Sequence, residues 1–248
     1  MKRLYLTAVL LLSACAAPLP QTPPSGVSAQ VPAPQIRVGD EWTYTVRDGF
    51  TGLPRPTERH RVAEARGDQL IVAVTRDGIA EEFQIYDARW NWIKRPATNM
   101  QVFEYQPAYQ ALAFPLAAGA NWHATSTATD PATGKRFPVR IDGTVLGWER
   151  VRVPAGEFDA LKVRRVVFLM YHDPSVRERS EIIEIEWYAP AVRQAVRRDT
   201  NSRYMSYLHG EAGPGFVRVR GDRGGGSVPR LVQDDWLIYE LSSHGGSR

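Results

Sequence analysis

The chain has 248 residues, of which 43% are hydrophobic, 23% charged and 10% aromatic, and its formal net charge is +4. This composition excludes a disordered chain, and the aromatic residues beside 20 glycines and 18 prolines favour a β-rich domain over a coiled coil. The apolar run over residues 4–12 is too short for a transmembrane helix, which needs about 20 residues.

The first 14 residues have the organisation of a secretory signal peptide. A basic start, Met1-Lys2-Arg3, precedes the apolar run, and small residues follow it up to Cys15. The segment Leu12-Ser13-Ala14-Cys15 resembles the lipobox of bacterial lipoproteins. This resemblance implies cleavage before Cys15 and attachment of acyl chains, including palmitate, to that residue. An ordinary signal peptide that is cleaved after a later alanine is the alternative.

Cys15 is the single cysteine of the chain, and this count limits the chemistry that we expect. A lone exported thiol is unfavourable unless it is capped, and lipidation of Cys15 would exclude disulfides, thiolate catalysis and cysteine-based metal sites. Two acyl chains are enough for stable anchoring, so a lipidated Cys15 would tie the protein to a membrane. By the same resemblance, Ala16 after the cysteine implies the outer membrane. Removal of residues 1–14 lowers the net charge to +2, and we expect no nucleic-acid partner.

A proline-rich segment follows the cysteine and precedes the folded part. Residues 16–35 contain six prolines and almost no aliphatic periodicity. Such segments favour polyproline II, so we expect residues 15–35 to be a lipidated linker that spaces the domain from the membrane. The antiparallel β domain is expected over residues 36–245.

Alternating apolar and polar residues predict most of the strands of this domain. Asp-Gly pairs predict hairpin turns at residues 48–49, 77–78 and 142–143, and residues 130–134 predict a longer turn. Pro107–Leu112 predicts a short helix that begins at its proline. Pro190–Arg198 fits a helix or a strand, and we favour the strand. The strands are expected at Trp42–Val46, Leu70–Val74, Phe83–Tyr86, Leu161–Tyr171, Ile182–Tyr188 and Asp235–Leu241.

Several short motifs resemble those of a group of uncharacterised bacterial envelope β-domains. The resemblance implies an all-β fold with a single, strongly curved antiparallel sheet, similar to the half-barrels that bind acyl chains of lipoproteins, and it implies no catalytic residues. The Pro154-Ala155-Gly156 segment has a physical reason of its own, because proline and glycine suit a tight turn. The motifs are Gly39-x-x-Trp42, Phe114-Pro115-Leu116, Gly119-x-x-Trp122, Val153-Pro154-Ala155-Gly156-x-Phe158 and Trp187-Tyr188-Ala189-Pro190.

Patterns that would indicate catalysis are weak in this sequence. The five histidines lack the spacing of metal ligands, and no Gly-x-Ser-x-Gly segment is present, so we expect no metal, no cofactor and no enzyme. Ser206 with His209 keeps a hydrolase as an alternative. Glu184 and Glu186 could form the paired carboxylates of a glycosidase, but a solvated strand face is the interpretation that we favour.

Two groups of residues remain as candidates for binding. Trp90 and Trp92 lie two positions apart, as neighbours on one strand face do, and with Trp187 they could hold an acyl chain or a sugar; packing of the tryptophan pair in the core is the alternative that we favour. The segment 193–230 is rich in arginine, which suits phosphate and carboxylate groups, although solvated loops are the interpretation that we favour. We therefore expect a non-enzymatic, membrane-anchored envelope lipoprotein whose periplasm-facing domain binds a partner protein or an amphiphilic ligand; a hydrolase and a purely structural protein are the alternatives. The candidate arginines are Arg193, Arg197, Arg198 and Arg203.

Overall fold

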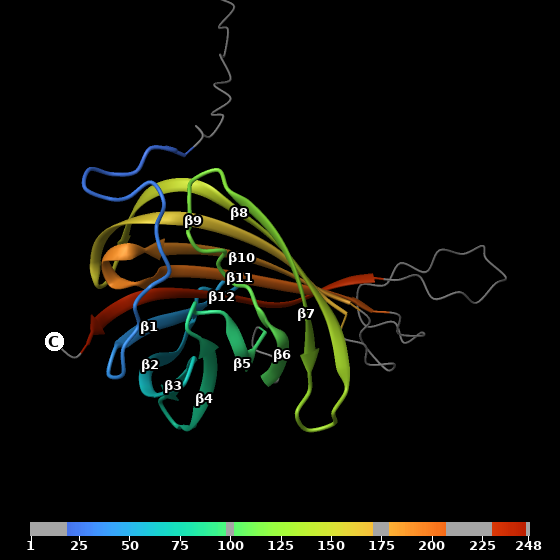
Figure 1. Ribbon diagram of the computed structural model, residues 1–248. Coiled ribbons are helices and arrows are strands. Elements are labelled where there is room, and N and C mark those ends of the chain that lie inside the picture. The colour runs from blue at the N-terminus through green and yellow to red at the C-terminus, as the bar shows by residue number, and fades with distance from the viewer. Residues whose placement is uncertain (1–18, 98–101, 171–178, 207–229, 247–248) are drawn as a thin grey trace, which may run out of the picture.

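The computed structural model describes residues 19–97, 102–170, 179–206 and 230–246 (Figure 1). Over these residues the chain forms twelve strands and a 3-10 helix, η1 (Pro190–Val192). The first six strands are β1 (Glu41–Asp48), β2 (Pro54–Arg66), β3 (Gln69–Arg76), β4 (Ile79–Asp87), β5 (Trp92–Pro96) and β6 (Val102–Tyr109). The last six are β7 (Asn121–Thr129), β8 (Arg136–Val153), β9 (Gly156–Leu169), β10 (Ser180–Ala189), β11 (Gln194–Ser206) and β12 (Arg230–Gly245).

The strands form one antiparallel sheet that closes into a barrel. Each strand pairs with its neighbours in the sequence, and β12 returns to pair with β1 from Glu41 opposite Gly245 to Asp48 opposite Leu237. The all-β, antiparallel prediction is confirmed, but the half-barrel is wrong. Closure occurs because β12 satisfies the free edge of β1, which an open sheet would leave exposed.

The predicted turns are partly confirmed. Asp77-Gly78 joins β3 and β4, with Gly78 at a φ of 75°, and Pro154-Ala155 joins β8 and β9, with Gly156 at a φ of 134°. The turn predicted at Asp142-Gly143 is wrong, since both residues lie inside β8. Gly143 is small there for another reason: a Cβ atom would lie 2.2 Å from Cζ2 of Trp122.

The segment predicted as a helix and the one that fitted either a helix or a strand also differ from the structure. Pro107–Leu112 forms no helix, because its first residues belong to β6. Pro190–Arg198 is divided between η1 and β11, with Arg193 in the left-handed region at a φ of 59° between them. The strand that we favoured is therefore correct only from Gln194 onward.

The barrel interior holds most of the buried apolar residues. A large cluster surrounds Trp42, Trp92 and Phe103, and a smaller one at the barrel end includes Val31, Leu116 and Trp148. The β8–β9 turn reaches across to β12, where the Ala155 N–H donates to the carbonyl of Leu241 over 2.9 Å. In the described residues no helix is long and apolar enough to cross a membrane.

The proline-rich segment packs against the barrel and does not extend freely away from it. From Leu19 onward it lies against the barrel end, and Val31 forms a β-bridge with Leu116. The expected linker is thus attached to the domain over much of its length. Cys15 lies outside the described residues.

Candidate functional site

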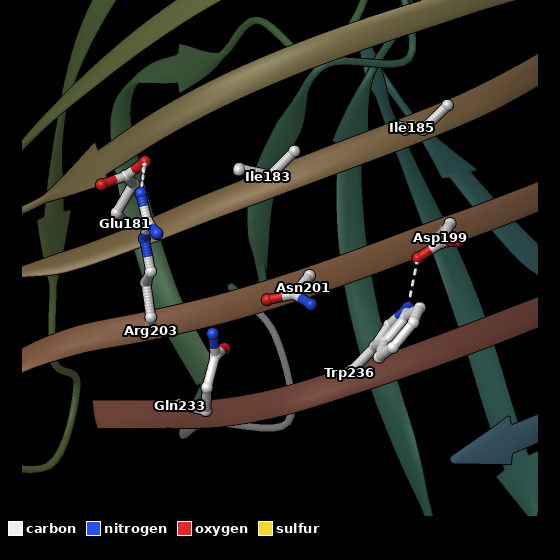
Figure 2. Close-up of a pocket in the computed structure, with 8 residues that line it drawn as sticks. All are labelled: Glu181, Ile183, Ile185, Asp199, Asn201, Arg203, Gln233 and Trp236. Atoms are coloured by element: carbon white, nitrogen blue, oxygen red, sulfur yellow. Dashed lines mark hydrogen bonds and ion pairs between the residues drawn. The ribbon is translucent and has the colours of Figure 1, made fainter. Parts of the chain in front are cut away.

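A groove of about 350 Å³ lies on the outer face of β10, β11 and β12 (Figure 2). Strand alternation places its residues outside, because the neighbours Ile182 and Glu184 are 2% and 3% exposed and point into the barrel. The register arranges the groove in rows across the strands, with Ile183 opposite Asn201 and Asn201 opposite Trp236. The lining residues are Glu181, Ile183, Ile185, Asp199, Asn201, Arg203, Gln233 and Trp236.

The charged groups at the two ends of the groove are engaged by each other or by the indole. Arg203 Nη2 lies 2.8 Å from Oε1 of Glu181. At the other end, Trp236 Nε1 donates to Oδ1 of Asp199 over 2.6 Å. These bonds fix the side chains in place, and the groove has a net charge of −1 from one arginine and two carboxylates.

The centre of the groove has polar groups that are free for a ligand. Asn201 and Gln233 make no side-chain hydrogen bonds within the described residues, and each amide offers donors and an acceptor. Ile183 and Ile185 supply an aliphatic surface beside them. The arrangement therefore suits a ligand that combines apolar surface with uncharged hydrogen-bonding groups.

The three predicted tryptophans lie in the protein core and not in an open pocket. Trp90 sits in the β4–β5 turn at a φ of 67° and stacks on Tyr86 at 4.2 Å between ring centroids. Trp92 begins β5 and stacks on Tyr109 at 4.1 Å. Both are less than 7% exposed, so they are packing residues, and the prediction that they share the face of one strand is wrong.

Trp187 is also buried, at 6% exposure, but its surroundings are polar. Its Nε1 donates to Oε2 of Glu149 over 3.0 Å. The cations of Lys162 and Arg197 lie 4.8 and 5.0 Å from its ring centroid. The indole of Trp187 therefore already contacts charged side chains of the same chain.

The four predicted arginines do not form one basic patch. Arg193 pairs with Asp40 at 2.8 Å, Arg197 lies 3.6 Å from Glu240, and Arg203 belongs to the groove. Arg198 points into the barrel, where its guanidinium lies 4.1 Å from the ring centroid of Tyr239. Each arginine thus has its own surroundings: Arg193 precedes β11, and the neighbours Arg197 and Arg198 lie on opposite faces of that strand.

The barrel interior contains an ionic cluster that the sequence analysis missed. Arg165 of β9 is fully buried and contacts Glu184 at 2.8 Å, Glu186 at 2.7 Å and the carbonyl of Ala111 at 2.9 Å. Burial raises the pKa of Glu184, but the attraction and hydrogen bond of Arg165 outweigh burial and hold that pKa below its usual value. The predicted solvated face of Glu184 and Glu186 is therefore wrong.

A second interior cluster involves Glu58 and His60 of β2. Glu58 lies 3.0 Å from His60 and 2.7 Å from Arg76. Burial raises the pKa of Glu58, but its bonds to His60 and Arg76 lower it overall to about 2. Burial lowers the pKa of His60, which is 8% exposed, so the imidazole is neutral near pH 7.

The Arg165 cluster differs from the paired carboxylates of a glycosidase. A glycosidase needs one carboxyl group with a raised pKa as its acid, whereas Glu184 has a lowered pKa and Arg165 binds both glutamates. Ser206 ends β11, and His209 lies outside the described residues. Among the residues that the structure describes, no group of three or more metal-ligating side chains is present.

The sequence matches no protein-family profile, and the comparison with curated proteins gives no significant match. Among solved structures, the chain is similar to a candidate lipoprotein from Parabacteroides distasonis, with 16% identity, a TM-score of 0.46, and coverage of 88% of this chain and 100% of that one. A candidate exported protein with a YmcC-like fold from Bacteroides fragilis has 13% identity, a TM-score of 0.45, and coverage of 87% and 99%.

The hypothetical lipoprotein YmcC from Escherichia coli is a third similar structure. Its identity is 10% and its TM-score 0.37, with coverage of 84% of this chain and 86% of that chain. Similarities of this size carry no information about function. The candidate site therefore depends on the residues of this chain.

Sequence reasoning found Arg203 but missed the other groove residues. Asn201 comes from the next strand, β11, and Gln233 and Trp236 come from β12, which lies further along the sequence from Ile183 and Ile185. One signal was present: Ile183 and Ile185 alternate with charged residues along a single strand. The alternation shows that the strand has two different faces, and it does not show which face is turned outward.

Proposed function

We propose that this chain is a non-enzymatic lipoprotein of the cell envelope, anchored to the outer membrane by acyl chains on Cys15 and facing the periplasm, and that its groove binds an uncharged amphiphile. The observation that carries the binding role is the pair of free amides, Asn201 and Gln233, beside the aliphatic surface of Ile183 and Ile185. A hydroxyl-rich headgroup would bond to the amides, and the apolar part would cover the isoleucines.

The charges of the groove disfavour an anionic ligand, and its two amides favour an uncharged group that forms hydrogen bonds. Arg203 is engaged by Glu181, and the net charge of −1 disfavours an anionic amphiphile. This proposal differs from the expectation of an arginine-rich site for anionic headgroups. The proposal does not depend on an apolar cavity for an acyl chain, because Trp90 and Trp92 are packed against tyrosines inside the barrel.

Calorimetric titration tests the groove. The lipidated chain in phospholipid nanodiscs would be titrated with hexyl glucoside, hexyl sulfate and hexyltrimethylammonium, and the heat from empty nanodiscs would be subtracted. We expect the glucoside to bind more tightly than the sulfate, which the net charge disfavours, and more tightly than the trimethylammonium compound, whose headgroup cannot form hydrogen bonds with the amides. Asn201→Ala should weaken glucoside binding about three- to tenfold, since a neutral hydrogen bond contributes about 0.5–1.5 kcal/mol.

Thr125→Ala is the matched control, because Thr125 is exposed on β7 and lies outside the groove. Its affinity for hexyl glucoside should equal that of the wild type. Equal affinity in Asn201→Ala and the wild type, or no glucoside binding at all, would contradict the proposed ligand class.

Metabolic labelling tests the anchor. Cells that express the full chain would be fed a radiolabelled fatty acid, and the protein would be immunoprecipitated. We expect label in the wild type and none in Cys15→Ala, because no other cysteine is present. Equal labelling of both proteins would refute lipidation at Cys15.

A further inference from the structure

The proline-rich segment after the anchor cysteine is bound to one end of the barrel. We call residues 19–36 the strap. The carbonyl of Pro20 accepts a hydrogen bond from the Trp148 N–H over 2.8 Å, and Gln21 Nε2 donates to the Leu146 carbonyl over 3.0 Å. Further along, Val31 is 3% exposed and exchanges two backbone hydrogen bonds with Leu116, each of 2.8 Å. The strap is therefore held at both ends.

A glycine in β8 allows this close approach. Gly147 has a φ of 140°, a conformation that side-chain-bearing residues rarely adopt. A Cβ atom at this position would lie 2.8 Å from Cβ of Leu19 and 2.8 Å from the carbonyl oxygen of Pro20. Only glycine leaves room for the strap to lie on β8.

The strap and the loop beneath it carry no charged side chains of their own, and a charged side chain contacts the strap at its far end, where Arg193 donates to the carbonyl of Gln35 over 2.6 Å. Residues 19–36 and 105–122 contain no Asp, Glu, Lys, Arg or His. At the 23% charged content of the whole chain, these 36 residues would carry about eight charges. The exposed parts of the strap and of residues 117–121 therefore form what we call the charge-free face.

Covalent geometry places the anchor close to this face. Four peptide links separate Cys15 from Leu19, and a fully extended chain spans at most about 3.6 Å per residue. The two Cα atoms are therefore no more than about 14 Å apart. An acyl chain on Cys15 would bring Leu19, and the barrel surface to which it is bound, to the surface of the membrane.

We propose that the charge-free face lies against the lipid bilayer. This inference rests on the proposed lipidation of Cys15. A surface without charged groups can approach the headgroups without the cost of stripping water from ions. The strap then fixes the orientation of the barrel, with the β7–β8 turn directed away from the bilayer. Figure 1 shows that turn on the side of the barrel opposite to the strap.

Fluorescence quenching tests this orientation in the full, lipidated chain. Ala120→Cys places a label on the charge-free face, and Lys135→Cys places the matched label in the β7–β8 turn; both positions are exposed. Strand β7 has nine residues, so at about 3.3 Å per residue the two labels are roughly 30 Å apart. In phosphatidylcholine vesicles with nitroxide headgroups, the label at position 120 should be quenched at least threefold more strongly.

Flotation of the same vesicles separates the two ways in which the test can fail. A chain that does not float with the vesicles overturns the lipid anchor, and this inference with it. A chain that floats but shows equal quenching at positions 120 and 135 overturns the orientation alone.

Variants of the strap contacts test whether the strap sets the orientation. In Gly147→Ala the added Cβ atom should displace Leu19 and Pro20, and in the milder Gln21→Ala only one side chain is lost. We expect both variants to float with the vesicles. The difference in quenching between positions 120 and 135 should become smaller in both, and it should decrease more in Gly147→Ala than in Gln21→Ala. If Gly147→Ala fails to fold, the quenching measured in Gln21→Ala alone tests whether the strap sets the orientation. An unchanged difference in the variants that fold would show that the strap does not orient the barrel.

Discussion

Replacement of Arg165 by methionine should destabilise the barrel more than a typical core substitution. Arg165 is fully buried and binds two carboxylates, those of Glu184 and Glu186, within 2.8 Å. Methionine preserves much of the side-chain volume but removes the charge. The variant therefore leaves two buried glutamates without their cation.

The contacts of Arg165 determine how much stability the variant loses. Removal of one partner from a buried ion pair costs about 3–5 kcal/mol, because the remaining charge is uncompensated. Arg165 also donates to the carbonyl of Ala111, and the loss of that bond adds about 1 kcal/mol. We expect a decrease of about 4–6 kcal/mol in the free energy of unfolding at pH 7, which is a large part of the stability of a typical domain.

The pH dependence distinguishes this cause from a simple packing defect. In the wild type, Arg165 holds the pKa of Glu184 below its usual value. Without that cation, burial raises the folded-state pKa of Glu184 above the unfolded value of about 4.3. A carboxyl group whose folded-state pKa lies above its unfolded-state value stabilises the folded state as pH falls. The difference in the free energy of unfolding between the wild type and the variant should therefore be smaller at pH 4.5 than at pH 7.

Urea unfolding followed by circular dichroism would measure both quantities. A triple variant with Arg165→Met, Glu184→Gln and Glu186→Gln is the control, since it removes the two buried charges together with the cation. It should recover at least half of the lost stability. A loss below 1 kcal/mol, a deficit that does not change with pH, or no recovery in the triple variant would refute this reasoning.

Two further predictions concern acid and packing. The pKa of Glu58 in the folded state is lowered to about 2, so Glu58 contributes about 3 kcal/mol to stability above pH 4.5, and this contribution is lost as pH falls toward 2. The pKa of His60 is also lowered, so protonation of His60 reduces stability further as pH falls below about 6.5. In urea unfolding, Glu58→Gln should flatten the fall in stability between pH 4.5 and 2, and an unchanged slope would contradict the role of Glu58. Gly143→Ala should cost about 1–3 kcal/mol in thermal unfolding, because its Cβ would lie 2.2 Å from Trp122, whereas Gly245→Ala, with no atom within 4 Å, should stay within 0.5 kcal/mol. Equal melting temperatures for the two glycine variants would disprove the contact.

The sequence by itself determined the local structure of this protein. Period-two alternation identified the strands around Trp42–Val46 and Ile182–Tyr188, and the Asp77-Gly78 and Pro154-Ala155-Gly156 turns are where the sequence predicted them. These features depend on the conformational preferences of residues within a few positions of one another, so a single segment contains the information.

Barrel closure and the inner face of each strand depend on tertiary structure. The alternation of Glu184 and Glu186 with Ile183 and Ile185 predicted two different faces of β10, but the charged face is the one inside. The reason is the pairing with β9, which sets Arg165 opposite Glu184 and compensates the buried carboxylates. In the same way, β1 and β12 close the barrel across about 190 residues of sequence. A local pattern contains neither fact, because both depend on partners that only the folded chain brings together.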